Sequence, residues 1–198
     1  MNDKRFDASK AGKLDDSARL VWLPPAEVIG ALAVQTGDSI ADIGAGTGYF
    51  SLPLAVAAGL RGKVYAVDSQ AEMLALLRLK LDSESVSNIE LVHAEADSTG
   101  LPDASCSLVF MALVWHEFTD RAAAVRESKR ILKPGGRIAI LDWRPDVEPE
   151  AGPPLDHRLS ASDAANSLQT VGFSQVAHTN AGKYSWLVQG VTQGEMEK

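Results

Sequence analysis

The sequence has little of what several classes of protein require. It contains one cysteine, Cys106, so no disulfide can form within the chain and a reducing compartment is the natural setting. No apolar run approaches the ~18 residues that a membrane-spanning helix needs. The polar N-terminal stretch 1–13 lacks the apolar segment of a signal peptide. These absences predict a cytoplasmic protein without membrane insertion.

Positive charge is also scarce. The chain carries 19 Lys and Arg against 26 Asp and Glu, a formal net charge of −7. Nucleic-acid binding usually needs clustered basic residues, so we expect no nucleic-acid partner. No group of His, Cys and Asp has the spacing of metal ligands, so no metal is predicted. A small neutral or cationic ligand fits the charge balance better than a polyanion does.

The pattern of apolar residues predicts one α/β domain over residues 1–198, with an N-terminal helical arm over 1–36 and a core over 37–198. Strands are predicted over 39–43, 63–67, 89–93, 107–111, 137–141, 173–178 and 184–191. Helices are predicted over 25–33, 47–58, 70–81, 120–132 and 160–171. The alternation indicates a doubly wound, mostly parallel, Rossmann-like sheet of seven strands, and the last two strands form an antiparallel hairpin. Ligands of such sheets bind beyond the carboxyl ends of the strands.

A glycine-rich turn between the first strand and its helix is the strongest local signal. It reads Asp42-Ile43-Gly44-Ala45-Gly46-Thr47-Gly48. Glycines allow a sharp turn and the close approach of a ligand. The dinucleotide fingerprint has the spacing G-x-G-x-x-G, whereas this turn has G-x-G-x-G and places Tyr49 where the third glycine would stand. The acidic Asp42 also suits a cationic ligand better than a pyrophosphate.

Two carboxylates follow the next strands. Asp68 ends the second strand, about 20 residues past the glycine turn, where a carboxylate accepts both ribose hydroxyls. The alternative is a solvated Asp that caps the following helix. Ala96-Asp97 follows the third strand and is suited to an adenine amino group, with an ordinary loop Asp as the alternative.

These motifs resemble those of class I S-adenosylmethionine-dependent methyltransferases, and more narrowly the ubiquinone/menaquinone-biosynthesis type. Residues 42–48 match the first family motif, Val67-Asp68 the second and Ala96-Asp97 the adenine motif. Leu132-Lys133-Pro134-Gly135-Gly136-Arg137 matches the turn before the fifth strand. The resemblance covers residues 14–173. It implies methyl transfer from S-adenosylmethionine, with S-adenosylhomocysteine as product, to a small-molecule acceptor.

The resemblance also implies a set of cofactor-binding residues at the ends of the first four strands. They are Asp42, Gly44, Ala45, Gly46, Gly48, Asp68, Ser69, Met73, Ala96, Asp97, Met111 and Ala112. Met73 would pack on the adenine, and plain core packing is its alternative.

The reaction site is predicted after the fourth strand, at Trp115-His116-Glu117. His116 is the candidate general base because its unperturbed pKa lies near neutrality. Glu117 would orient His116 or bind a cationic substrate, and Trp115 would line the pocket. The alternative is that His116 and Glu117 only cap the next helix.

Two other segments are candidates for covering the site. The run 152–158 after the fifth strand carries His157 and Arg158 as candidate substrate-binding residues, with a solvated loop as the alternative. The N-terminal segment 13–23 would cover the cofactor, with helix packing as the alternative.

Three functions remain open at this point: methyl transfer, a nucleotide (NAD)-dependent oxidoreductase, and a module that binds S-adenosylmethionine without catalysis. No Asn/Asp-Pro-Pro-Tyr/Phe motif follows the fourth strand, which disfavours methylation of an adenine amino group. We expect a monomer or homodimer. The acceptor atom is not predicted.

Overall fold

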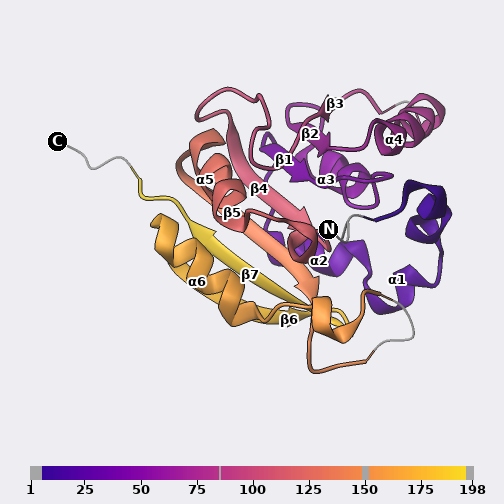
Figure 1. Cartoon of the computed structure of the whole chain (residues 1–198). Helices are drawn as coiled ribbons and strands as arrows, with labels where there is room; N and C mark the ends of the chain where they lie inside the picture. The colour runs from indigo at the N-terminus through magenta and orange to yellow at the C-terminus, as the bar shows by residue number, and fades with distance from the viewer. Residues whose placement is uncertain (1–5, 85, 149–151, 195–198) are drawn as a thin grey trace.

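The computed structural model describes residues 6–84, 86–148 and 152–194, so the ends of the predicted domain and part of the loop after the fifth strand lie outside the described residues. Seven strands form one sheet in the order β3-β2-β1-β4-β5-β7-β6 (Figure 1). The strands are β1 (Ser39–Ile43), β2 (Lys63–Asp68), β3 (Ile89–His93), β4 (Cys106–Ala112), β5 (Leu132–Trp143), β6 (Ser174–Ala181) and β7 (Ser185–Val191). The first five pair in parallel, and β7 pairs antiparallel with both β5 and β6. The predicted fold class is confirmed.

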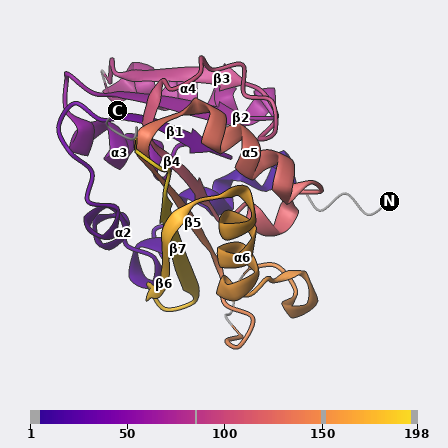
Figure 2. The same cartoon turned by 90° about the vertical axis from the view of Figure 1, so that its left-hand side faces the viewer.

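Helices cover both faces of the sheet. They are α1 (Arg19–Trp22), α2 (Pro25–Leu32), α3 (Ser51–Ala58), α4 (Ala71–Glu84), α5 (Arg121–Ile131) and α6 (Ala161–Val171), with short 3-10 turns η1 (Ala8–Asp15), η2 (Trp115–Glu117) and η3 (Leu155–His157). Figure 2 shows α2 and α3 on one side of the sheet and α5 and α6 on the other. Among the described residues, none of these helices has the length and apolarity to cross a bilayer.

The alternation of side chains along each strand divides the core in two. Ile40, Leu108 and Phe110 pack with α2, α3 and α4 on one face. Ala41, Val109 and Met111 point to the other face and pack with α5 and α6. Because successive strand residues point to opposite faces, one run of apolar residues supplies both halves of the core.

Several element boundaries differ from the prediction. The helix predicted from residue 47 begins at Ser51, because Gly44, Gly46 and Gly48 all have positive φ and cannot continue a right-handed helix. The strand predicted over 137–141 extends from Leu132 to Trp143 and runs through the Pro134–Gly136 segment that was expected only to stop the helix. Within the predicted N-terminal helical arm, residues 8–15 form a 3-10 helix capped by Asp7.

The register of the parallel strands brings the candidate residues to one edge. Ile43 pairs with Val67 on one side and with Met111 on the other, and Met111 pairs with Ile140. The segments that follow these strands therefore begin level with one another. This edge carries the glycine turn, Asp68, His116 and the end of β5.

Candidate active site

The glycine turn is fixed to the neighbouring strand at its start. The backbone N–H groups of Gly44 and Ala45 both donate to the carbonyl of Val67, at 2.8 and 3.0 Å. A Cβ added to Gly44 would lie 2.5 Å from Cγ1 of Val114, a residue of the segment that leads to His116. Only glycine fits here, because the φ of +75° and the contact with Val114 both exclude a side chain.

Asp68 lies directly beside this turn. Its carboxylate accepts hydrogen bonds from the backbone N–H of Gly46, at 2.8 Å, and of Gln70, at 2.9 Å. Its exposed fraction is 8%, and burial raises the pKa of its carboxyl above the ordinary value. A carboxylate has about four acceptor positions, so Asp68 keeps acceptor capacity for two ligand hydroxyls.

Asp42 is an almost fully buried acid of this edge, with an exposed fraction of 2%. The hydroxyl of Ser51, the first residue of α3, donates to its Oδ2 at 2.5 Å. Burial raises the pKa of Asp42 to about 7, and the Ser51 hydrogen bond opposes this only in part. A buried carboxylate is stabilised by a nearby positive charge, so this position suits a cationic ligand.

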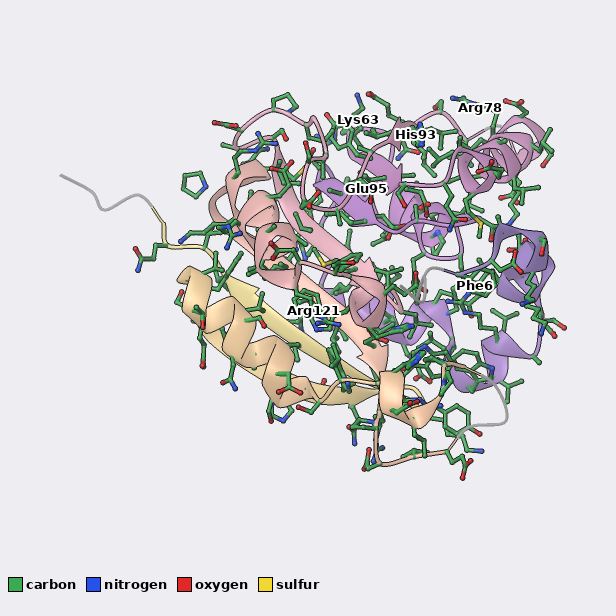
Figure 3. All side chains as sticks on the ribbon, viewed as in Figure 1. Phe6, Lys63, Arg78, His93, Glu95 and Arg121 are labelled. Carbon is green, nitrogen blue, oxygen red and sulfur yellow. The ribbon has the colours of Figure 1, made fainter. Side chains whose placement is uncertain are left out.

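The other predicted cofactor residues lie at the same edge, in different environments. Met73 and Met111 are fully buried, Ala45 is nearly so, Ser69, Ala96 and Ala112 are half-buried, and Asp97 is exposed. His93 and Glu95 mark the β3 side of the sheet, apart from Arg121 at the start of α5 (Figure 3). Asp97 sits in the turn closed by the Glu95–Ser98 bridge, where its carboxylate is open to a ligand.

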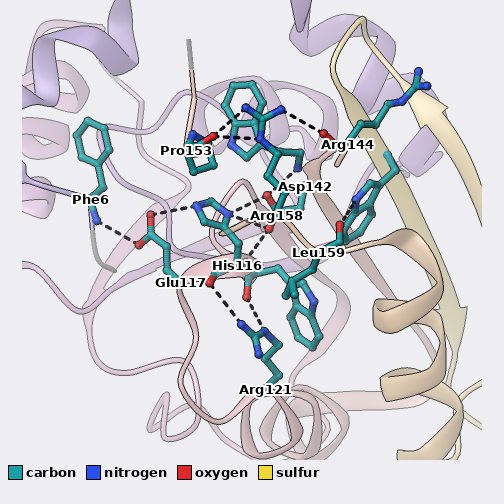
Figure 4. A network of polar contacts seen from close by, with 12 residues as sticks. Phe6, His116, Glu117, Arg121, Asp142, Arg144, Pro153, Arg158 and Leu159 are labelled. Atoms are coloured by element: carbon teal, nitrogen blue, oxygen red, sulfur yellow. Dashed lines mark hydrogen bonds and ion pairs between the residues drawn. The ribbon is translucent and has the colours of Figure 1, made fainter. Parts of the chain in front are cut away.

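His116 is held by a residue that the sequence analysis did not identify. Its ring Nδ1 lies 2.9 and 3.0 Å from the two carboxylate oxygens of Asp142, and its backbone N–H donates to the same carboxylate at 2.8 Å (Figure 4). Asp142 also accepts from the backbone N–H of Trp143. An acceptor-only carboxylate at Nδ1 selects the tautomer with a proton on Nδ1 and a lone pair on Nε2.

The pKa of His116 reflects two opposing influences. Burial favours the neutral ring, but the hydrogen bond and negative charge of Asp142 outweigh burial, and the pKa of His116 lies above its ordinary value. Nε2 lies 3.8 Å from Oε1 of Glu117. Burial raises the pKa of Glu117 to about 7, and its Oε2 accepts from the backbone N–H of Phe6 at 3.2 Å (Figure 4).

The turn η2 is not the cap of the next helix. Asp120 caps α5 through a hydrogen bond from Ala123 N–H to its side chain. Arg121 donates to the carbonyls of Trp115 and His116 and so holds η2 from the other side. The Trp115 ring is fully buried in the core, and its Nε1 has no hydrogen-bond partner among the described residues.

Arg158 joins the ends of the loop after β5. Its guanidinium donates to the carbonyls of Pro153, Arg144 and Val147, and lies 5.6 Å from the Trp143 ring centroid (Figure 4). These contacts hold Arg144, Val147 and Pro153 around one guanidinium. His157 is half-buried in η3.

The N-terminal segment lies over the glycine turn. The Thr47 hydroxyl donates to Asp15, and Lys80 of α4 binds both Asp15 and the Thr47 carbonyl. Cδ1 of Leu14 lies 3.4 Å from the position of a Cβ on Gly46. We call residues 6–23 the N-terminal cover.

Comparison with known proteins agrees with this geometry. Residues 41–140, slightly more than half of the chain, match the family described as Methyltransferase domain. The chain belongs to this family, within the class I S-adenosylmethionine-dependent methyltransferases. S-adenosylmethionine is accordingly its cofactor, and the acceptors Asp42 and Asp68 fit the cationic and ribose parts of that molecule.

Individual relatives support the assignment over different lengths. The chain is 37% identical over 137 residues to the ubiquinone/menaquinone biosynthesis C-methyltransferase UbiE of Hahella chejuensis, covering 68% of this chain and 55% of the relative. It is 30% identical over 165 residues to UbiE of Cellvibrio japonicus, covering 82% and 63%. The chain thus spans less than two thirds of these relatives. A crystal structure of an S-adenosylmethionine-dependent methyltransferase from Aquifex aeolicus is 32% identical, with a TM-score of 0.89 and coverage of 94% and 99%.

Asp142 is the functional candidate that sequence reasoning missed. The predicted fifth strand ended at Leu141, which placed Asp142 at the carboxyl end of a parallel strand, where ligands bind. The same rule that selected Asp68 after the second strand would have selected Asp142.

Proposed function

We propose that this chain transfers the methyl group of S-adenosylmethionine to a small-molecule acceptor whose nucleophile carries a proton, and that His116 removes the proton. The observation that supports this most is the pairing of His116 with Asp142. A buried carboxylate on Nδ1 leaves Nε2 as the basic nitrogen of the ring.

Different residues are proposed to bind the cofactor, orient the base and exclude water. The cofactor supplies an electrophilic methyl group, so the protein must align the acceptor, exclude water and accept a proton. Asp68 and the glycine turn bind the adenosyl part. Asp142 orients His116 and stabilises the charged ring after His116 has taken the proton. The N-terminal cover, joined to Glu117 through Phe6, limits the access of water.

Glu117 gives the acceptor side a second titrating group. With its pKa raised to about 7, it is partly protonated at neutral pH and changes charge over the range in which His116 acts. We infer that Glu117 contacts a polar group of the acceptor next to the reacting atom. His157 of η3 and Arg158, which follows η3, are the further residues proposed to contact the acceptor. Trp115 begins η2 and anchors it in the core.

The proposal also covers the cellular compartment and the oligomeric state of the protein. A single cysteine, buried at the start of β4, is consistent with the cytoplasm. We propose action as a monomer or homodimer. The family assignment does not favour the nicotinamide-dependent alternative.

The test begins with calorimetric titration of S-adenosylmethionine and S-adenosylhomocysteine, with NAD as control. Tritiated methyl transfer to a panel of phenols, enols, amines and carboxylic acids then identifies the acceptor. The rate should rise with pH through the pKa of His116, because only the neutral ring accepts a proton. Asp142→Asn should move this rise to lower pH and reduce the plateau.

Several results would contradict the proposal. Binding of NAD alone would restore the oxidoreductase hypothesis. Binding of the adenosyl ligands without methyl transfer to any member of the panel would support a binding module. A pH profile unchanged in Asp142→Asn would remove His116 as the base.

A further inference from the structure

The His116 ring lies between two carboxylates (Figure 4). Its Nδ1 lies 2.9 Å from Asp142, and its Nε2 lies 3.8 Å from Oε1 of Glu117, which is too far for a hydrogen bond. With the ring proton on Nδ1, Nε2 and Oε1 are two hydrogen-bond acceptors that face each other. No described residue donates to either atom. The His116 side chain is only 7% exposed and that of Glu117 16%, so the two acceptors are largely shielded from water and need a shared donor.

The negative charge of Glu117 also lacks a basic side chain as partner among the described residues. Its Oε2 accepts from the backbone N–H of Phe6 at 3.2 Å, and its one ion-pair contact is the His116 ring. The guanidinium groups of Arg121 and Arg158, in the same view, donate to backbone carbonyls instead (Figure 4). A half-buried carboxylate in this position is stabilised by a cation that a ligand brings.

Acceptor nucleophiles differ in how well they suit these two atoms. A hydroxyl or an enol donates one hydrogen bond, so it can satisfy Nε2 or Glu117 but not both. It also becomes an anion when it loses its proton. Burial, and then the negative charges of Asp142 and Asp68, raise the pKa of Glu117, so a further anion beside it is disfavoured.

A protonated amine meets both requirements. In its primary or secondary form it carries a positive charge and at least two N–H donors. Hydrogen bonds of ~2.9 Å are long enough for one nitrogen to reach two acceptors that lie 3.8 Å apart. One N–H can therefore point at Nε2 of His116 while another points at Oε1 of Glu117.

We propose that the methyl acceptor is a primary or secondary amine whose nitrogen binds between Nε2 of His116 and Oε1 of Glu117. The inference rests on the proposed function and names its substrate class. The ammonium group gives one proton to Nε2, and the freed lone pair of its nitrogen attacks the methyl carbon. The carbon–sulfur bond breaks and leaves its electron pair on sulfur. The products are the methylated ammonium compound and S-adenosylhomocysteine, and His116 then releases its proton to water.

The first experiment uses methylammonium, which presents the charged amine without any assumption about the rest of the acceptor. In the complex with S-adenosylhomocysteine, at a pH at which the ring is neutral, methylammonium chloride should shift the ¹⁵N resonance of His116 Nε2, and sodium chloride at the same concentration should not. In Glu117→Gln, which keeps an acceptor oxygen for Phe6, the methylammonium concentration that gives half of the shift should rise at least tenfold. Glu72→Gln, exposed in the first turn of α4, is the matched control and should respond as the wild type does.

The second experiment measures tritiated methyl transfer to a panel of primary and secondary amines, each paired with the hydroxyl compound of the same skeleton. The wild-type protein should methylate amines in preference to their hydroxyl partners. In Glu117→Gln, kcat/KM for an accepted amine should fall at least tenfold, whereas the affinity for S-adenosylhomocysteine should stay within about twofold.

Three outcomes would overturn the inference. The first is a His116 resonance that does not respond to methylammonium, or responds equally in Glu117→Gln. The second is methyl transfer to hydroxyl compounds and to no amine, which would leave the proposed function in place. The third is transfer to no member of either kind, which would remove the proposed function together with the inference.

Discussion

The two halves of the active-site edge are built in different ways. On the cofactor side, the glycine turn and Asp68 lie in two short stretches that each follow a strand, and backbone hydrogen bonds from Gly44, Ala45 and Gly46 join them. On the acceptor side, His116 and Asp142 are 26 residues apart and meet only because β4 and β5 pair in parallel. A contiguous motif fixes the first site, and strand pairing fixes the second. The first is therefore the part that a sequence reveals.

The largest effect is expected at Gly44, where the glycine turn contacts Val114 of the segment that leads to His116. Gly44→Val should abolish measurable cofactor binding, because any Cβ meets Val114 at 2.5 Å and the positive φ adds strain. The same clash displaces the segment that leads to His116. Calorimetry with S-adenosylhomocysteine measures the loss. Gly37→Val has a φ of +95° with no atom near its Cβ, and it should bind normally after its folding is checked by circular dichroism. Unchanged affinity in Gly44→Val would move the site elsewhere.

Replacing His116 should impair methyl transfer while leaving cofactor affinity nearly unchanged. His116→Ala should lower single-turnover methyl transfer by about 10²–10⁴-fold, the usual contribution of a positioned general base. Its affinity for S-adenosylhomocysteine should stay within about twofold, because His116 lies on the acceptor side. His178→Ala, exposed on β6, is the control and should keep full activity. Wild-type turnover in His116→Ala would make His116 a structural residue.

Replacing Asp68 should have the opposite result and impair cofactor affinity more than the rate of methyl transfer. Asp68→Ala should weaken binding of S-adenosylhomocysteine by about 1–3 kcal/mol, because it strips acceptors from two hydroxyls. Single-turnover rates at saturating cofactor should change much less than the affinity does. Asp97→Ala tests the predicted contact of Asp97 with adenine in the same assay. If Asp68→Ala impaired turnover without impairing affinity, the division into two sides would be wrong.

The last prediction concerns the stability of the fold and Asp42, and it leaves the two sides of the site unseparated. Its pKa is raised to about 7 in the folded protein, so the folded chain keeps a proton that the unfolded chain has released. The resulting stabilisation is complete below about pH 4 and is lost as the pH rises to about 7. Asp42→Asn should remove this decline, and its free energy of unfolding relative to wild type should rise by at most about 4 kcal/mol between pH 4 and pH 8. Urea unfolding at both values measures this, with the exposed Asp97→Asn as control. An unaltered pH slope in Asp42→Asn would contradict the assignment.

Local patterns predicted most of the fold. The bounds of β1 and β3 agree with the prediction to the residue, because each is a short apolar run between turn residues. The start of α3 was wrong by four residues, since periodicity does not show that three successive glycines adopt positive φ. The bulge in β5 between Leu132 and Arg137 was missed because Pro134 and Gly135 normally end an element.

The candidate site was predicted unevenly for a similar reason. Asp42, Asp68 and His116 could be selected because each lies at the end of an identifiable strand or shortly after it. Asp142 depends on a tertiary contact, because it reaches His116 from the neighbouring strand β5. No local pattern encodes such a contact. The rule that ligands lie at strand ends would still have indicated Asp142.

The most direct test of the account is the titration of the His116 ring by long-range ¹H–¹⁵N NMR. The chain has four histidines, so the loss of one set of signals in His116→Asn assigns the ring. The account predicts a neutral ring with its proton on Nδ1, a pKa above the ordinary value of about 6.5, and a fall in that pKa in Asp142→Asn. A proton on Nε2, or a pKa below the ordinary value, would contradict the role of His116 as the base held by Asp142.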